Sequence, residues 1–278
     1  MSAEARRREI VQMLLARDSV MTSEIVERFG VSTMTAHRDL DALQEQGLLR
    51  KVYGGATATA SGLFESSLAF RRNSMAEAKR GIAAYAARYV EPGSSLLLDD
   101  STTSLAMLPF LRRIPGLTIV TNFLAVVEEV TKAGGDTRLI IAGGEYDPKY
   151  HALMGVVSER TLADLRVDRC FMSASAVDTA GVFHQDPAEV RLMHTRIEIA
   201  EEALLLVDSS KLGRRALHHV VGLDAFARIV IDAGADDTEV AELRNAGGRI
   251  ELADPTGDSV PADGDRPDGV RRSPRRSS

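Results

Sequence analysis

Residues 32–38 combine small hydroxyl, sulfur-containing and basic side chains at a spacing that suits contact with DNA. If this stretch is helical, Ala36, Leu40 and Leu43 fall on one stripe that must face a core, so the opposite side faces solvent. A recognition helix enters the major groove with its N-terminal residues at the base edges, where arginine can pair with guanine and methionine can contact a thymine methyl group. The residues expected to meet DNA from this helix are Ser32, Thr33, Met34, Thr35, His37 and Arg38.

Two short helices joined by a tight turn would position these side chains. Thr22 or Ser23 can cap the first helix, and Gly30 can end it. The Ser32 side chain can accept hydrogen bonds from the amides that open the second helix, and Gly47 is its expected end. The sequence therefore predicts a helix-turn-helix unit, although a helical hairpin with a merely solvated outer face would show a similar pattern.

A short β-ribbon is expected after the second helix. Residues 48–52 read as a strand and residues 53–55 as a turn, which together would form a wing that brings Lys51 and Tyr53 to the DNA backbone. Upstream, the basic run of residues 6–8 is expected to act as an arm that leads into the first helix and contributes further positive charge.

A second group of polar residues follows strand-like runs in the rest of the chain. In open α/β sheets, ligands bind beyond the carboxyl ends of the strands, and hydroxyl groups and free amides there suit a phosphate. The pattern predicts a pocket for a small phosphorylated polyol, although each group also has an ordinary role as a cap, a turn or a solvated lysine. The residues expected to line this pocket are Asp99, Ser101, Thr102, Thr103, Asn122, Gly143, Gly144 and Lys211.

Short apolar runs alternate with helical patterns from residue 95 to residue 252. This alternation predicts an α/β domain whose mostly parallel sheet is covered on both faces. The chain is therefore divided into a winged helix-turn-helix domain (1–58), a linker (59–73), an α/β effector-sensing domain (74–253) and a disordered tail rich in Pro, Gly, Asp and Arg (254–278).

Composition limits the function classes. The formal net charge is −6, and residues 1–60 carry eight Lys/Arg and eight Asp/Glu, so DNA affinity is expected to depend on dimeric geometry and modest phosphate contact. No apolar stretch is long enough to predict a membrane span, and the N-terminus is charged. The single cysteine, Cys170, cannot form an internal disulfide, so a cytoplasmic protein is expected.

The N-terminal motifs resemble the DeoR-family winged helix-turn-helix. The resemblance rests on Val31-Ser32-x-x-Thr35-x-His37-Arg38-Asp39-Leu40, on Gly47-Leu48-Leu49 and on Tyr53-Gly54-Gly55-Ala56. Ala36 replaces a larger aliphatic residue of the family pattern, and His37 replaces an arginine. Because histidine offers a different donor set, an operator sequence is not carried over from relatives.

The C-terminal motifs are similar to the DeoR-family sensor domain. They include Leu98-Asp99-x-Ser101-Thr102-Thr103, Val120-Thr121-Asn122, Gly143-Gly144 and Asp208-Ser209-Ser210-Lys211, and the stretch Asp178-x-x-Gly181 adds Asp178 to the expected effector site. The resemblance implies a fold like that of ribose-5-phosphate isomerase and a sugar-phosphate effector. Ser101 and Ala176 stand where the family pattern has glycine.

The expected function is therefore a DNA-binding transcriptional regulator, a repressor of a sugar or carbohydrate operon, that works as a homodimer or homotetramer. The alternative is a sugar-phosphate isomerase-like enzyme, because a fold does not fix an activity. Acid–base candidates for that alternative are Asp99, Asp178, His184, Asp186 and Glu189, but Asp186 before Pro187 also reads as a helix start. No catalytic residue, cofactor or metal site is predicted, because the histidines and the one cysteine lack ligand spacing.

Overall fold

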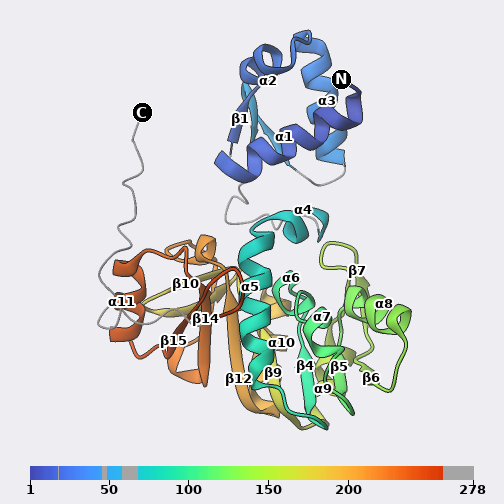
Figure 1. The fold of residues 1–278 in the computed structure, drawn as a ribbon, viewed down its shortest axis with the longest axis vertical. Helices are drawn as coiled ribbons and strands as arrows, with labels where there is room; N and C mark the ends of the chain where they lie inside the picture. Colours follow the sequence, from blue (N-terminus) through green and yellow to red (C-terminus); the bar gives the residue numbers. More distant parts are fainter. Residues whose placement is uncertain (18, 46–48, 58–67, 259–278) are drawn as a thin grey trace.

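The computed structural model describes residues 1–258 apart from 18, 46–48 and 58–67 (Figure 1). The described residues form two packed units, each with its own apolar core. The expected helix end at Gly47, most of the expected linker and the tail from residue 259 lie outside the described residues. The two-part organisation expected from the sequence is otherwise visible in the two cores.

The N-terminal unit packs three helices against a small antiparallel sheet with the strand order β1-β3-β2. Ala36, Leu40 and Leu43 of α3 are buried in its core, as their helical spacing predicts. Gly30 ends α2 with φ 61°, a left-handed conformation that glycine adopts without a Cβ clash. The elements are α1 (Ala3–Arg17), β1 (Ser19–Met21), α2 (Thr22–Phe29), α3 (Thr33–Glu45), β2 (Arg50–Val52) and β3 (Gly55–Thr57).

The start of this unit differs from the expectation. The basic run of residues 6–8 belongs to helix α1, because Ile10, Val11 and Leu14 give that helix an apolar side that is buried in the core. The N-cap of α2 is Met21, not Thr22 or Ser23, and the Glu24 carboxylate accepts a hydrogen bond from the Met21 amide at 2.8 Å. The predicted wing is confirmed as β2, a turn and β3.

The C-terminal unit is built on a seven-stranded sheet whose paired strands are all parallel. Runs of consecutive buried residues in its central strands require cover on both faces, which the sequence predicted. The strand order is β15 (Ile250–Ala253), β14 (Arg228–Asp232), β12 (Ala200–Val207), β9 (Val167–Met172), β4 (Ser95–Leu98), β5 (Thr118–Thr121) and β6 (Arg138–Ile141).

Helices cover this sheet. Helix α5 crosses in front of it and packs on β12, β14 and β15, whereas α10 packs on β9 and β12 (Figure 1). The helical segments are α4 (Leu68–Asn73), α5 (Ala76–Ala86), η1 (Ala87–Tyr89), α6 (Thr102–Leu105), α7 (Leu108–Leu111), α8 (Leu124–Ala133), α9 (Val156–Ala163), α10 (Pro187–Ile199), η2 (Ser209–Lys211), η3 (Leu223–Ala225) and α11 (Asp237–Asn245).

Two smaller antiparallel sheets join the main one, and the sequence analysis did not predict them. They contain β7 (Glu145–Asp147) with β8 (Ala152–Met154), and β10 (Ala176–Asp178) with β11 (Gly181–His184) and β13 (His218–Val221). The predicted tail begins too early, because residues 254–258 form a turn closed by Asp254. A Cβ atom at Gly81 of α5 would collide with the Asp254 carbonyl, so this turn lies directly on α5.

Candidate functional site

The outer face of α3 is the candidate DNA-reading surface. Its N-terminus is closed by Ser32, whose hydroxyl accepts a hydrogen bond from the Thr35 amide at 3.2 Å, as the sequence predicted. Met34 is 66% exposed, and His37 and Arg38 are exposed beside it. The Arg38 guanidinium lies 3.8 Å from the Met34 sulfur, so a basic group and an apolar group stand together on the outer face.

The remaining predicted residues of this helix divide into two groups. Ser32 and Thr33 are exposed, whereas Thr35 is half-buried and its hydroxyl lies 2.9 Å from that of Ser32. A hydroxyl engaged within the helix start is less available to a ligand. The geometry therefore leaves Thr33, Met34, His37 and Arg38 as the groups directed away from the core.

The wing carries one free aromatic ring and one paired lysine. Tyr53 is fully exposed in the turn between β2 and β3. Lys51 is half-buried, and its ammonium lies 2.5 Å from the Asp41 carboxylate on α3. This ion pair ties the wing to the acidic side of α3, so Lys51 must exchange Asp41 for a phosphate if it contacts DNA.

Arg6 and Arg7 do not form the basic arm that the sequence predicted. Arg6 and Arg7 of α1 donate to the two oxygens of the Asp39 carboxylate at 2.6 and 2.9 Å. Asp39 is 2% exposed and lies on the inner side of α3. The cause is the helix itself, because α1 turns these side chains toward α3. They fasten the recognition helix instead of extending toward solvent.

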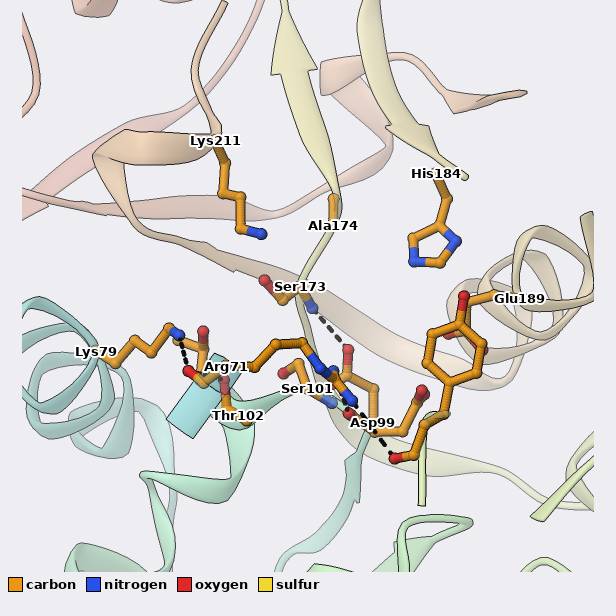
Figure 2. A pocket seen from close by; sticks show the side chains of 13 residues that line it. Arg71, Lys79, Asp99, Ser101, Thr102, Ser173, Ala174, His184, Glu189 and Lys211 are labelled. Atoms are coloured by element: carbon orange, nitrogen blue, oxygen red, sulfur yellow. Dashed lines mark hydrogen bonds between the residues drawn. The ribbon is translucent and has the colours of Figure 1, made fainter. Parts of the chain in front are cut away.

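A polar pocket lies at the carboxyl ends of the central strands of the C-terminal unit (Figure 2). It encloses about 470 Å³, part of which is open to solvent. Five predicted effector residues line it: Asp99, Ser101, Thr102, Thr103 and Lys211. The other lining residues are Arg71, Lys79, Asp100, Tyr150, Ser173, Ala174, His184 and Glu189.

One side of the pocket is cationic. Lys79 and Lys211 extend toward it from α5 and η2 (Figure 2). Arg71 of α4 also lines the pocket, but its guanidinium lies across it, 5.8 Å from the centre of the Tyr150 ring. Burial lowers the pKa of Lys79 to about 8; the nearby Asp208 carboxylate opposes this shift, and the charges of Lys211 and Arg71 add to it. Three cations around one small pocket repel each other, and an anion between them relieves that repulsion.

Helix α4 forms part of the pocket wall, although residues 59–73 were predicted to be a linker. The Arg71 carbonyl accepts hydrogen bonds from the Lys79 ammonium at 2.6 Å and from the Thr102 hydroxyl at 3.2 Å. The Arg71 guanidinium donates to the Asp100 carbonyl at 3.3 Å. The segment that follows residues 58–67 is thus anchored to two groups that line the pocket.

The floor of the pocket holds a buried cluster of charges. Arg196 is 0% exposed and donates to Asp100 at 2.8 Å, to Asn122 at 3.0 Å and to Glu189. Burial raises the pKa of Asp99 and of Glu189, and the positive charge of Arg196 opposes both shifts. The neighbouring carboxylates raise the pKa of Arg196 even though burial alone would lower it.

Asp99 and Ser101 shape the end of β4. The Asp99 carboxylate accepts from the Ser173 amide at 2.7 Å, from the Ser101 amide at 3.1 Å and from the Ser104 hydroxyl at 2.6 Å. Ser101 is the N-cap of α6, with its hydroxyl 3.0 Å from the Ser104 amide. The Ser101 side chain therefore folds back on its own helix. Ala176 is buried in β10 and does not line the pocket.

Four predicted effector residues do not line this pocket. Asn122 lies beneath it and binds Arg196 and the Leu153 carbonyl. Gly143 and Gly144 lead into β7, where a Cβ at Gly144 would collide with the Met154 carbonyl of β8. Asp178 accepts a hydrogen bond from the Ala180 amide at the turn between β10 and β11. Their positions at strand ends reflect local roles in packing and turns.

Sequence reasoning missed Arg71, Lys79, Tyr150 and Ser173. Lys79 carried a signal that was overlooked: it is a lysine on the inward side of the helix over 76–86, next to Ile82 and Ala83. A buried lysine needs a partner or a function, so its helical position alone made it a candidate. Tyr150 lies in the turn between β7 and β8, two strands that the sequence analysis did not predict, and it lines the pocket from there.

The acid–base candidates are only partly assembled. Asp99, His184 and Glu189 line the pocket, and the His184 ring lies 6.2 Å from that of Tyr150. Asp186 caps α10 by accepting from the Ala188 amide at 2.9 Å, as its position before Pro187 indicated. Glu189, one of the acid–base candidates, pairs with Arg196. Among the described residues, no group of His, Cys, Asp or Glu could hold a metal ion.

Two family models match this chain. The DeoR-like helix-turn-helix domain matches residues 6–61, and the DeoR C terminal sensor domain matches residues 74–233. This chain belongs to the DeoR family. The resemblance seen in the sequence is confirmed, and it covers the unit that carries α3 and the unit that carries the pocket.

Curated DeoR-family relatives match along most of their length. The glycerol-3-phosphate regulon repressor of Escherichia coli strain K12 is 31% identical over 234 residues, which is 84% of this chain and 92% of that protein. A putative aga operon transcriptional repressor of Escherichia coli O157:H7 is 29% identical over 250 residues (89% and 93%). The lactose phosphotransferase system repressor of Staphylococcus epidermidis is 32% identical over 208 residues (74% and 82%).

Solved structures with a similar arrangement include ribose 5-phosphate isomerase A of Methanocaldococcus jannaschii. That match has 17% identity and a TM-score of 0.36, and it covers 50% of this chain and 55% of that one. The Pyrococcus horikoshii OT3 translation initiation factor eIF-2B matches with 15% identity and a TM-score of 0.41 (58% and 64%).

Membership of the DeoR family makes this chain a DNA-binding transcriptional regulator with a sensor domain. The exposed face of α3 and the polar pocket are therefore its two candidate sites. Within the part of the chain that the structure describes, no helix has the length and apolar character to cross a membrane.

Proposed function

We propose that this DeoR-family chain is a cytoplasmic repressor of a sugar or carbohydrate operon and that a sugar phosphate binds its pocket. The observation that carries the effector part is the convergence of Arg71, Lys79 and Lys211 on one small polar pocket. Guanidinium and ammonium groups are the side chains that bind phosphate, and the Thr102 hydroxyl adds a further hydrogen-bonding group. The relatives named glycerol-3-phosphate regulon repressor and lactose phosphotransferase system repressor support the same class of effector.

The N-terminal unit, called the head from here on, would read its operator through α3 and the wing. Thr33, Met34, His37 and Arg38 are directed away from the core, and Tyr53 stands free at the wing tip. Arg38 would contact a guanine edge or a phosphate, and Met34 a thymine methyl group. Paired heads would read the two halves of a symmetric operator, so a homodimer or homotetramer is proposed.

Helix α4 would couple the two sites. Its Arg71 carbonyl is held by Lys79 and Thr102, and both of these side chains also line the pocket. A phosphate that recruits Lys79 or Thr102 competes for those hydrogen bonds and changes how α4 is anchored. Since residues 58–67 connect α4 to β3 of the head, the ligand would favour one arrangement of the heads over another.

The test removes one cation from the pocket. Lys211→Ala should abolish the response of operator binding to sugar phosphates while leaving operator affinity unchanged, because Lys211 lies in the sensor unit. Thr102→Ala should do the same. Lys132→Ala, an exposed lysine near the end of α8, is the matched control and should leave the response intact. Loss of operator binding in Lys211→Ala with an intact ligand response would overturn the two-site scheme.

A further inference from the structure

The carboxyl group of Glu189 is only partly used by its neighbours, because one of its two oxygens accepts no hydrogen bond from the described residues. It lies on the first turn of α10 and is 4% exposed, and one of its oxygens pairs with Arg196. The other, Oε2, is buried and has no hydrogen-bond partner among the described residues. A buried carboxylate oxygen without a partner costs free energy, so a ligand that donates a hydrogen to it gains correspondingly.

The charges around Glu189 favour a ligand group that donates a hydrogen bond to its carboxyl group. Asp99, Asp100 and Glu189 share a single buried guanidinium, that of Arg196, which is in direct contact with only two of them. Burial raises the pKa of Glu189 well above its usual range, and Asp100 and Asp99 contribute to that shift. The buried cluster therefore holds three carboxyl groups around one guanidinium, and among the described residues both Glu189 Oε2 and the Arg196 Nε lack a hydrogen-bond partner.

Glu189 lies on the opposite side of the pocket from the two lysines. Figure 2 shows Glu189 and His184 on one side of the pocket, while Lys79 and Lys211 lie on the other. Arg71 contributes a further buried, unpartnered donor, its Nε, to the same pocket. A ligand that fills the space would meet the ammonium groups of Lys79 and Lys211 on one side and the Glu189 carboxyl group on the other, so its own ends must differ in chemistry.

We infer that Glu189 is a specificity-determining residue, and that it accepts a hydrogen bond from a hydroxyl or amino group of the effector. This inference rests on the proposed function, in which the phosphate of the same molecule lies against Lys79 and Lys211. A polyol or amino-sugar phosphate satisfies both ends of the pocket. Inorganic phosphate and alkyl phosphates satisfy only the cationic end, and the Glu189 oxygen stays unpaired.

The first experiment varies the ligand and leaves the protein intact. Calorimetric titration of the full chain should show that glucose 6-phosphate, ribose 5-phosphate or glycerol 3-phosphate binds at least about tenfold more tightly than the alkyl phosphate with the same number of carbons. Equal affinity for every sugar phosphate and its alkyl counterpart would overturn the inference. Glucosamine 6-phosphate against glucose 6-phosphate then distinguishes an ammonium donor from a hydroxyl donor, and either preference supports the assignment.

The second experiment changes the acceptor. Glu189→Gln should reduce the preference for the polyol phosphate to within about twofold of the alkyl phosphate, while affinity for inorganic phosphate stays unchanged. Glu198→Gln, an exposed glutamate on the same helix, should keep the wild-type preference. Glu189→Asp keeps the charge but moves the carboxyl group back by one methylene, so it should show an intermediate preference. It also serves as the second variant if Glu189→Gln does not fold.

The outcomes separate the two levels of the proposal. If the wild-type chain binds neither inorganic phosphate nor any sugar phosphate, the proposed effector site itself is wrong. If phosphate binds and Glu189→Gln and Glu189→Asp both keep the full preference for polyol phosphates, the site stands and the role of Glu189 is overturned. Turnover of a sugar phosphate by the purified chain would make Glu189 a candidate base instead of a selector, and would also overturn the inference.

Discussion

The two candidate sites use charged residues in opposite ways. On α3, Met34, His37 and Arg38 lie on the exposed face of one helix, and their contacts to the rest of the protein are few. In the pocket, Arg71, Lys79 and Glu189 come from different helices and are partly or fully buried. A surface that reads a long, rigid polyanion can be built from one element, but a site that encloses a small ligand must be assembled from several.

Both sites nevertheless depend on a buried ion pair behind the working face. Asp39 joins α3 to Arg6 and Arg7 of α1, and Arg196 joins the pocket floor to Asp100 and Glu189. The pair in the head is open at one edge, because Arg7 is 33% exposed, whereas Arg196 is 0% exposed. The consequences of breaking each pair should therefore differ in size.

The largest effect is expected from Arg196→Met. This change keeps most of the side-chain volume but leaves Asp100 and Glu189 buried without their common partner, so it should destabilise the C-terminal unit by about 3–5 kcal/mol. Scanning calorimetry of the full chain should show the unfolding transition of that unit shifted down. Arg191→Met, on the same helix but paired with Glu159 at the surface, should cost less than about 1 kcal/mol. Equal shifts for the two variants would contradict the role given to burial.

A smaller effect is expected from Asp39→Asn in the head. The change removes the charge that Arg6 and Arg7 share, and should destabilise the N-terminal unit by about 2–3 kcal/mol because one of the two arginines remains hydrated. Urea unfolding followed by a head-specific probe measures it. Asp41→Asn, which loses only the half-exposed pair with Lys51, should stay within about 1 kcal/mol of wild type. If Asp41→Asn were the more damaging variant, α3 would not be held through Asp39.

Periodic patterns explain which features could be predicted from the sequence. The spacing of Ala36, Leu40 and Leu43 placed α3, and apolar runs separated by helical patterns placed the parallel sheet. Strand-end residues such as Asp99, Thr102 and Lys211 line one pocket, which could be predicted because the carboxyl ends of parallel strands meet at one edge. Each of these rules depends on local periodicity or on the topology of the sheet, both of which can be read from the order of residues.

The missed features depend on tertiary contacts. Arg71 was assigned to a linker because the stretch around it has little apolar periodicity, yet its carbonyl is bound by Lys79 and Thr102 from other segments. The sequence analysis gave Asp39 no structural role, and its burial depends on the contact of α3 with Arg6 of α1. Asn122 and Gly144 illustrate the converse, because both follow strands and yet neither lines the pocket.

Arg38→Ala changes the exposed face of α3 and should affect DNA binding without affecting stability. Because Arg38 contacts no core residue, the melting temperature should stay unchanged while affinity for a cognate operator falls about 10- to 100-fold. Fluorescence anisotropy at fixed salt measures the affinity. Arg112→Ala, an exposed arginine of the sensor unit paired with Glu129, is the charge-matched control and should bind as wild type does. Unchanged operator binding in Arg38→Ala would remove α3 as the reading helix.

The smallest expected effect is the pH dependence of effector binding, which tests the buried site. Lys79 has a pKa lowered to about 8, mainly by burial, and a bound phosphate would stabilise its ammonium form and raise that pKa again. Binding then takes up a proton above pH 8, so the contribution of Lys79 to affinity is full below that pH and is lost as pH rises, by less than about tenfold per unit.

A matched pair of lysine variants assigns this titration. Lys79→Arg keeps its charge throughout the range and should flatten the decline in affinity between pH 8 and 9.5, whereas Lys211→Arg should leave the decline in place. Isothermal titration at several pH values measures the affinity. Below about pH 6 every variant should bind more weakly, because a phosphate monoester then loses its second negative charge. A wild-type affinity that stays constant up to pH 9.5 would place the phosphate away from Lys79. The pocket would then not bind its ligand through a buried cation, and would not differ in this respect from the exposed face of α3.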